Sequence, residues 1–171
     1  MTENGLPPFL KNETCAVTGH RILSADFDEN ELYRTLKGIS EQGFRCFLVG
    51  MAIGFDTACF RALLKVKKED TAVKIAAVIP CVGQDAFFRE KDRETYRSLI
   101  GLADYKAVLE NEYREGCMLK RNDFLLANSS LLLAYLRTKR GGTWYTVRKA
   151  QSLGIPVRFF PEDLVGHAGQ E

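Results

Sequence analysis

The residues whose order most clearly suggests chemistry lie near the end of the chain: Gly141, Gly142 and Thr143. They follow the apolar run 131–136 and open a stretch of helical period. Such a strand-to-helix turn presents unpaired backbone N–H groups and the positive end of a helix dipole at one place, which suits a phosphate. Three cations stand just before the glycines: Arg137, Lys139 and Arg140. We expect a phosphate-binding loop here, the alternative being a flexible turn beside a solvated basic run.

A second polar loop follows the apolar run 14–18 and contains Gly19, His20 and Arg21. Gly19 permits a tight turn or a close backbone approach, and the Arg21 guanidinium offers paired donors for a phosphate or carboxylate. The alternative is an ordinary polar loop with a surface arginine. His20 is the only histidine outside the C-terminal tail, and the G-x-S-x-G elbow of serine hydrolases is missing from the sequence. A Ser-His-Asp triad is therefore not expected.

A third loop follows the apolar run 45–49 and contains Gly50, Gly54 and Asp56. The two glycines would let backbone amides approach a ligand, and Asp56 could accept hydrogen bonds from ribose hydroxyls or cap the following helix. The loop matches neither G-x-G-x-x-G nor the Walker A pattern, because no Gly-Lys-Ser/Thr follows. The classical dinucleotide-binding and P-loop NTPase classes therefore lose support.

Arg121 and Asn122 are polar residues inside an otherwise apolar helical stretch, residues 117–128. Polar groups on the packed side of a helix need partners, so this pair either bonds to a neighbouring loop or reaches into a cleft. We expect the cleft.

The five cysteines are scattered without a C-x-x-C pair, and the chain has two histidines, so neither a metal centre nor a cofactor is expected. Three thiols fall on strand or core-facing positions and are predicted to be buried and reduced: Cys15, Cys46 and Cys59.

Apolar runs of strand length alternate with helical segments along the chain. Strands are expected at residues 14–18, 45–49, 73–79, 106–109, 131–136 and 157–160. The first helix is marked by the capping box of Asp28 and Glu31 and by a stop at Gly43. Four more helices are expected around 58–66, over 84–99, over 117–128 and after residue 142. Strict β-α alternation with nearly continuous apolar strands predicts an α/β fold, a Rossmann-like three-layer sandwich with a mostly parallel sheet of about six strands.

A chain of 171 residues, 46% of them apolar, fits one domain, 1–171, with a core at 14–160 and loose tails at 1–12 and 166–171. The formal net charge of +2 does not call for a nucleic-acid or membrane partner. The first residues do not form a secretory signal, and the apolar runs are too short to cross a bilayer. The cytoplasm is the simplest compartment.

These loops, in this order, resemble the YpsA-like branch of the SLOG superfamily, which also contains the lonely-guy phosphoribohydrolases and the DNA-processing protein DprA. The resemblance covers residues 14–160. It implies a Rossmann-like domain whose cleft binds a nucleotide or a nucleotide derivative. Carried over by position, the ligand-binding residues would be Gly19, His20, Arg21, Gly50, Gly54, Asp56, Arg121, Asn122, Gly141, Gly142 and Thr143.

One departure from the lonely-guy enzymes concerns catalysis. Their glycine loop runs into a helix that bears a glutamate used in N-glycosidic cleavage, whereas residues 143–148 of this chain contain no carboxylate. A phosphoribohydrolase would have to recruit Asp56 or Glu112 instead. Some relatives are labelled lysine decarboxylases, but nothing in the sequence marks a pyridoxal phosphate site.

The first functional hypothesis is therefore a binding or sensing module for a nucleotide derivative, with a protein partner and a homodimer left open. The second is a nucleotide phosphoribohydrolase. A third is single-stranded DNA binding of the DprA type, which the near-neutral charge disfavours. Its cations would be Arg137, Lys139, Arg140 and Arg148, and its stacking surfaces Tyr135, Trp144 and Tyr145.

Overall fold

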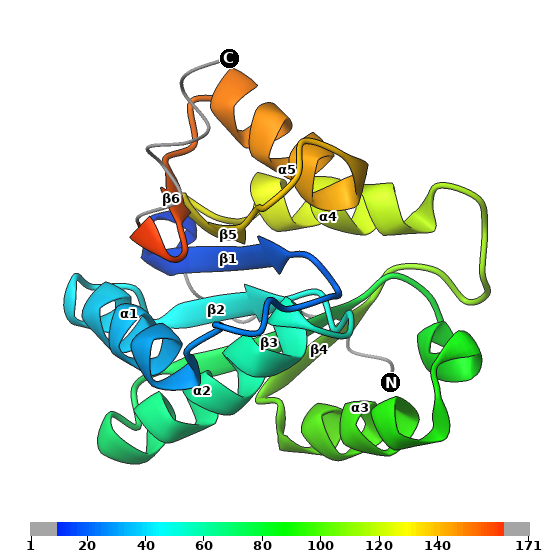
Figure 1. Cartoon of the computed structure of the whole chain (residues 1–171), viewed down its shortest axis with the longest axis horizontal. Helices are drawn as coiled ribbons and strands as arrows, with labels where there is room; N and C mark the ends of the chain where they lie inside the picture. Colours follow the sequence, from blue (N-terminus) through cyan, green and yellow to red (C-terminus); the bar gives the residue numbers. More distant parts are fainter. Residues whose placement is uncertain (1–9, 163–171) are drawn as a thin grey trace.

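The computed structural model describes residues 10–162, which form a parallel sheet covered by helices on both faces (Figure 1). The strand order is β4-β3-β2-β1-β5-β6, and every neighbouring pair is parallel. The strands are β1 (Thr14–Gly19), β2 (Cys46–Val49), β3 (Lys74–Ile79), β4 (Tyr105–Val108), β5 (Leu131–Tyr135) and β6 (Val157–Phe159). The predicted α/β Rossmann-like architecture is confirmed.

Five α-helices connect the strands: α1 (Glu29–Glu41), α2 (Phe55–Glu69), α3 (Glu90–Leu102), α4 (Cys117–Ala127) and α5 (Gly141–Ser152). Helices α1, α2 and α3 cover one face of the sheet, and α4 and α5 cover the other (Figure 1). Successive residues of a strand point to opposite faces. Cys15 and Val17 of β1 accordingly join the larger core under α1 to α3, while Ala16 joins the smaller core under α4 and α5.

Local sequence sets the ends of α1 as expected. The Asp28 carboxylate accepts hydrogen bonds from the backbone N–H groups of Asn30 and Glu31, at 2.9 and 3.1 Å. This side chain therefore satisfies two of the N–H groups that a helix leaves unpaired in its first turn. At the other end Gly43 has φ +108°, a backbone conformation that glycine adopts without a steric penalty.

The segment predicted as one helix over 84–99 is divided. Gln84–Phe87 forms a short 3-10 helix, Phe88 and Arg89 are extended, and α3 begins at Glu90. The guanidinium of Arg93 donates to the backbone carbonyls of Asp85, Ala86 and Phe88, which stabilises this break. The predicted loose tails at 1–12 and 166–171 fall largely outside the described residues, although Lys11–Glu13 forms a 3-10 turn.

The chain reverses its direction across the sheet at β1, which pairs with β2 on one side and with β5 on the other. In open α/β sheets ligands bind beyond the carboxyl ends of the strands at such a topological switch point. The loops after β1 and β5 therefore frame the place where a ligand is expected.

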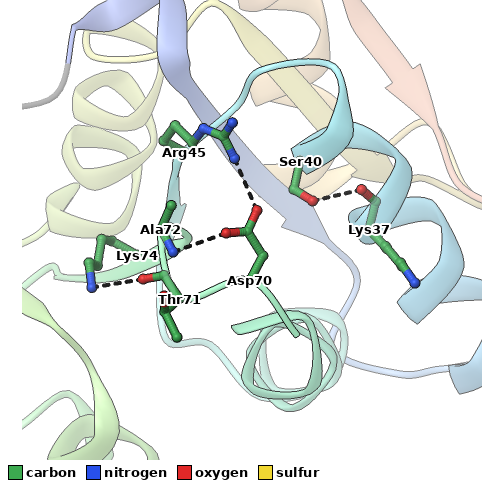
Figure 2. A network of polar contacts seen from close by, with 7 residues as sticks. All are labelled: Lys37, Ser40, Arg45, Asp70, Thr71, Ala72 and Lys74. Atoms are coloured by element: carbon green, nitrogen blue, oxygen red, sulfur yellow. Dashed lines mark hydrogen bonds and ion pairs between the residues drawn. The ribbon is translucent and has the colours of Figure 1, made fainter. Parts of the chain in front are cut away.

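The opposite, amino-terminal edge of the sheet is held by a polar network (Figure 2). Arg45, just before β2, forms an ion pair of 3.0 Å with Asp70, just after α2. The second Asp70 oxygen accepts from the backbone N–H of Ala72, and Lys74 donates to the carbonyl of Thr71. These contacts stabilise the turn between α2 and β3, and none of them lies at the carboxyl edge of the sheet.

All five cysteines are buried and unpaired: Cys15, Cys46, Cys59, Cys81 and Cys117. The predicted burial of the first three is confirmed. Among the helices of residues 10–162, none has the length and apolar character needed to cross a membrane.

Candidate functional site

A cavity of about 670 Å³ opens at the switch point, between the loop after β1, the loop after β5 and helix α4. The predicted site residues that line it come from four segments of the chain: Gly19, His20, Arg21, Asp56, Arg121, Asn122, Gly141, Gly142 and Thr143. The expectation that Arg21, Asp56, Arg121 and Thr143 gather around one cleft at this edge is confirmed. Gly50 and Gly54 do not line the cavity; they lie against Arg121 and Arg21, respectively.

His20 ties the loop after β1 to the loop after β5. Its ring Nε2 accepts a hydrogen bond of 3.2 Å from the backbone N–H of Thr138. Burial, followed by the charge of Arg137, lowers the pKa of His20 below its ordinary value. The imidazole is therefore mostly neutral near pH 7, as an accepting nitrogen must be.

The start of α5 forms one wall of the cavity. Arg140 occupies the N-cap position but makes no capping hydrogen bond, so no side chain at this position satisfies the first-turn N–H groups. Gly141 has φ +78°, a conformation that side chains rarely allow. At Gly142 an added Cβ would meet only Asn122 Nδ2, at 3.5 Å, which is an ordinary contact. The protein itself therefore leaves room for a side chain at residue 142.

Arg121 and Asn122 reach the cavity from α4 while they are 94% buried. Arg121 donates through Nη1 to the carbonyl of Gly50 and through Nε to the Asn122 oxygen, the latter at 2.8 Å. Both alternatives considered from the sequence are realised, because Arg121 bonds to a neighbouring loop and also lines the cleft. An added Cβ at Gly50 would lie 2.6 Å from Arg121 Nη1, so this glycine makes space for the guanidinium.

Asp56 lies in the first turn of α2, whose N-cap is Gly54. Its Oδ2 accepts a 3.0 Å hydrogen bond from the backbone N–H of Ala52, and its Oδ1 is buried without a partner in residues 10–162. Burial raises the pKa of Asp56 to about 6, although the charge of Arg121 and the Ala52 N–H both act to lower it. The site thus contains a buried acceptor that nothing in this part of the chain satisfies.

The other glycines serve the backbone. Gly54 has φ +80°, and a Cβ there would lie 2.2 Å from the carbonyl oxygen of Arg21, so the two loops touch at this point. A Cβ at Gly19 would lie 2.5 Å from the Phe55 side chain. These glycines bring the loops of β1 and β2 into close contact and thereby position Arg21 and Asp56.

The lining of the cavity is electropositive, with four arginines and a single carboxylate, Asp56: the arginines are Arg21, Arg121, Arg137 and Arg140. An anionic ligand fits this charge. The sequence interpretation did not include the apolar wall that Met118 and Leu119 of α4 contribute. Apolar helix residues carry no local signal that distinguishes a cavity wall from a core.

Several residues considered for the alternative functions lie elsewhere. Glu112 is exposed beside Arg114 and does not line the cavity. Lys139 lies 6.0 Å from the centre of the Trp144 ring and also stands outside the cavity. The assignment of Tyr135 as a stacking surface for DNA was wrong, because its side chain is 1% exposed and stacks on Phe55 in the core.

No cluster of three or more metal-ligating side chains occurs between residues 10 and 162.

Two solved structures of the DNA-processing protein DprA share this fold. The protein from Streptococcus pneumoniae superimposes with a TM-score of 0.63 at 23% identity, over 87% of this chain and 50% of that one. The Helicobacter pylori protein, whose single-stranded DNA binding has been described, gives a TM-score of 0.62 at 16% identity, over 85% of this chain and 64% of that one. At these identities the likeness is one of fold.

Bacterial relatives match most of the sequence. The UPF0398 protein YpsA of Bacillus subtilis is 26% identical over 165 residues, covering 86% of this chain and 92% of its own length. A UPF0398 protein of Bacillus pumilus is 22% identical over 137 residues, covering 78% of this chain and 74% of its own length. The model of the YspA SLOG family (YpsA) matches residues 26–154, which include every predicted site residue except those of the loop after β1. The chain therefore belongs to the YspA SLOG family.

Proposed function

We propose that this protein binds a nucleotide or nucleotide derivative, with a phosphate of the ligand at the start of α5. The observation that carries the proposal is the cavity at the topological switch point, where arginines from three segments face a helix N-terminus without a side-chain cap. Backbone N–H groups and the helix dipole favour a negative charge there. Each charge-assisted hydrogen bond contributes roughly 1.5–3 kcal/mol, so two or three suffice for a nucleotide-sized ligand.

Gly142 supports this placement because the fold itself does not need a glycine at that position. An added Cβ would make only an ordinary contact with Asn122, and the backbone is not in the left-handed region. The protein could accommodate a side chain at residue 142 but has none. A ligand that occupies this space would explain the glycine. Thr143, which lines the same wall, offers a hydroxyl as an additional donor.

Asp56 supports a ligand that carries hydroxyl donors as well as a phosphate. Its unpartnered Oδ1 is an acceptor buried beside Arg121, and a buried carboxylate oxygen without a donor is unfavourable. A ribose hydroxyl would satisfy it. The proposal thus assigns the phosphate to the α5 end of the cavity and the sugar to the α2 end.

In this proposal the protein senses its ligand and reports it to a partner protein. The proposed compartment is the cytoplasm, because five free thiols suit a reducing environment.

The test begins with a thermal-shift screen of nucleoside monophosphates and ADP-ribose, since a ligand at 100 times its dissociation constant adds about 2.7 kcal/mol of stability. Calorimetry with the best compound then compares variants. Gly142→Val should abolish binding in a protein with an unchanged circular dichroism spectrum, and Thr143→Ala should cost about 0.5–1.5 kcal/mol. Unchanged affinity in folded Gly142→Val would refute the phosphate position.

Arg140→Ala and Lys139→Ala form a matched pair, because each removes one positive charge from the same loop but only Arg140 lines the cavity. Arg140→Ala should weaken binding, while Lys139→Ala should leave it nearly unchanged. Equal losses would indicate a diffuse electrostatic effect and not the proposed contact.

A second candidate function is N-glycosidic hydrolysis of a nucleotide, which Asp56 favours. A carboxyl whose pKa is about 6 can exchange a proton near neutral pH, and Asp56 lines the cavity. Incubation with nucleoside monophosphates should then release free base, and Asp56→Asn should stop the release. No base above the buffer control would assign the protein to binding alone.

A further inference from the structure

A second compartment, of about 700 Å³, adjoins the electropositive cavity. Arg21, Ile22 and Met118 line both spaces, so the two are neighbours along the carboxyl edge of the sheet. The charged residues that line the second compartment are Arg21, Arg89 and Asp92, two cations and one anion, whereas the first cavity has four arginines and one carboxylate. The second compartment is therefore less electropositive and is better suited to a neutral group.

Gln84 lines this compartment and carries an unsatisfied amide oxygen. Gln84 is 5% exposed, its Nε2 donates to the carbonyl of Gly50 at 3.3 Å, and its Oε1 is buried without a partner in residues 10–162. The acceptor at Gly50 fixes the orientation of the amide, because only its NH₂ group can donate. Oε1 must therefore face away from Gly50 and requires a donor.

Gly50 also connects the two compartments. Its carbonyl oxygen accepts from Gln84 and from Arg121, which lines the first cavity. Gln84 and Arg121 are thus held by the same carbonyl group, and one ligand that extends from the first cavity into the second compartment would contact both side chains.

The rim of the second compartment carries apolar side chains that are unusually exposed. Phe87 is 89% exposed, Ile22 85% and Tyr113 61%, and they belong to three different connections on the same edge of the sheet. Exposed apolar groups that gather around a concave site typically mark a place where a ligand is bound. Aromatic side chains at such a rim can stack on a planar ring.

We propose that this compartment binds a heterocyclic ring carrying an exocyclic amine, as in adenine or cytosine. The amine donates to Gln84 Oε1, and the ring stacks on Phe87. The inference rests on the proposed function, because the ring belongs to the nucleotide whose phosphate occupies the start of α5.

Calorimetry with five compounds tests it on the full chain. Ribose 5-phosphate has no ring, AMP and CMP have the aminated ring, and purine riboside 5′-monophosphate and pyrimidin-2-one riboside 5′-monophosphate have the same rings without the amine. AMP or CMP should bind about ten-fold more tightly than its counterpart lacking the amine, because the loss of the donor leaves Oε1 unpaired. Each ring compound should bind more tightly than ribose 5-phosphate.

The outcomes separate the two proposals. If none of the five compounds binds, the proposed function fails. If ribose 5-phosphate binds as tightly as the nucleotides, the phosphate site stands and the ring compartment is refuted. If ring compounds bind better than ribose 5-phosphate but the amine makes no difference, the assignment of Gln84 is overturned.

Variants provide an independent check. Gln84→Leu should remove the preference for the aminated ring while leaving the affinity for ribose 5-phosphate unchanged. Phe87→Ala, at a side chain too exposed to affect folding, should weaken AMP or CMP about ten-fold without affecting ribose 5-phosphate. Leu102→Ala is the matched control, because it removes a 52% exposed apolar side chain at the last residue of α3, which does not line the compartment. Equal behaviour of Phe87→Ala and Leu102→Ala would overturn the stacking assignment.

Discussion

The guanidinium of Arg121 occupies the space that a side chain at Gly50 would fill. Its Nη1 donates to the Gly50 carbonyl, and an added Cβ would lie 2.6 Å from the same nitrogen. These two residues are 71 positions apart in the chain. The sequence motif suggested that Gly50 contacts a ligand. In the structure Gly50 instead leaves space for the guanidinium of Arg121, and Arg121 lines the cavity.

Gly50→Ala should destabilise the protein by about 1–3 kcal/mol, because Arg121 is 6% exposed and loses a hydrogen bond that it cannot replace with water. Urea denaturation measures the change. Gly38→Ala is the control, since Gly38 lies within α1 with open space at its Cβ position. That variant should gain about 0.5–1 kcal/mol. Similar changes in both variants would contradict the role of Gly50.

Tyr135→Phe should loosen the loop after β1. The Tyr135 hydroxyl accepts from the backbone N–H of Ser24 at 3.1 Å and donates to the Ser24 hydroxyl at 3.0 Å. Removal of the hydroxyl should cost about 0.5–1.5 kcal/mol and accelerate hydrogen exchange at the Ser24 amide. The core ring contact with Phe55 should persist, so the near-UV spectrum should change little. Unaltered exchange at Ser24 would show that this bond does not hold the loop.

Asp56 should make the stability of the ligand-free protein depend on pH. Burial raises its pKa to about 6, so between pH 4 and pH 6, roughly, the folded state binds a proton more strongly than the unfolded state. The free energy of unfolding should therefore fall as pH rises through this window. The total change is about 3 kcal/mol, from a shift of about two pKa units.

Asp56→Asn isolates this contribution, because the amide oxygen can still accept from Ala52 but cannot ionise. Urea denaturation of both proteins at several pH values between 4 and 7.5 gives the difference. Relative to the asparagine variant, the wild type should lose stability as pH rises. A difference that is independent of pH would mean that Asp56 titrates as an ordinary aspartate.

Local rules predicted the parts of the fold that depend on neighbours in sequence. The Asp28 cap, the alternation of strands and helices, and the glycine turn before Thr143 all follow from residues within a few positions of one another. The division of the predicted third helix was missed, because the three backbone carbonyls that Arg93 binds have no signature in sequence periodicity.

The candidate site was predictable where its residues follow the end of an apolar strand, as Arg21 and Gly142 do. Parallel strands place the loops at their carboxyl ends on one edge of the sheet. It was not predictable where a residue acts through a distant partner. Gly19 makes room for Phe55, and the unsatisfied oxygen of Gln84 depends on a carbonyl 34 positions away. Only the packed structure shows such relationships.

The thiols of Cys15, Cys46 and Cys59 should resist alkylation in the native protein. All three are fully buried. Burial raises the pKa of Cys15 and Cys46 to about 12 and that of Cys59 well above its ordinary value, so the reactive thiolate is scarce near neutral pH. With iodoacetamide at pH 7.5, mass spectrometry of peptides should find these cysteines unmodified in the native state and fully modified in urea. Rapid native labelling of any one of them would show that its strand or helix opens far more readily than its packing implies.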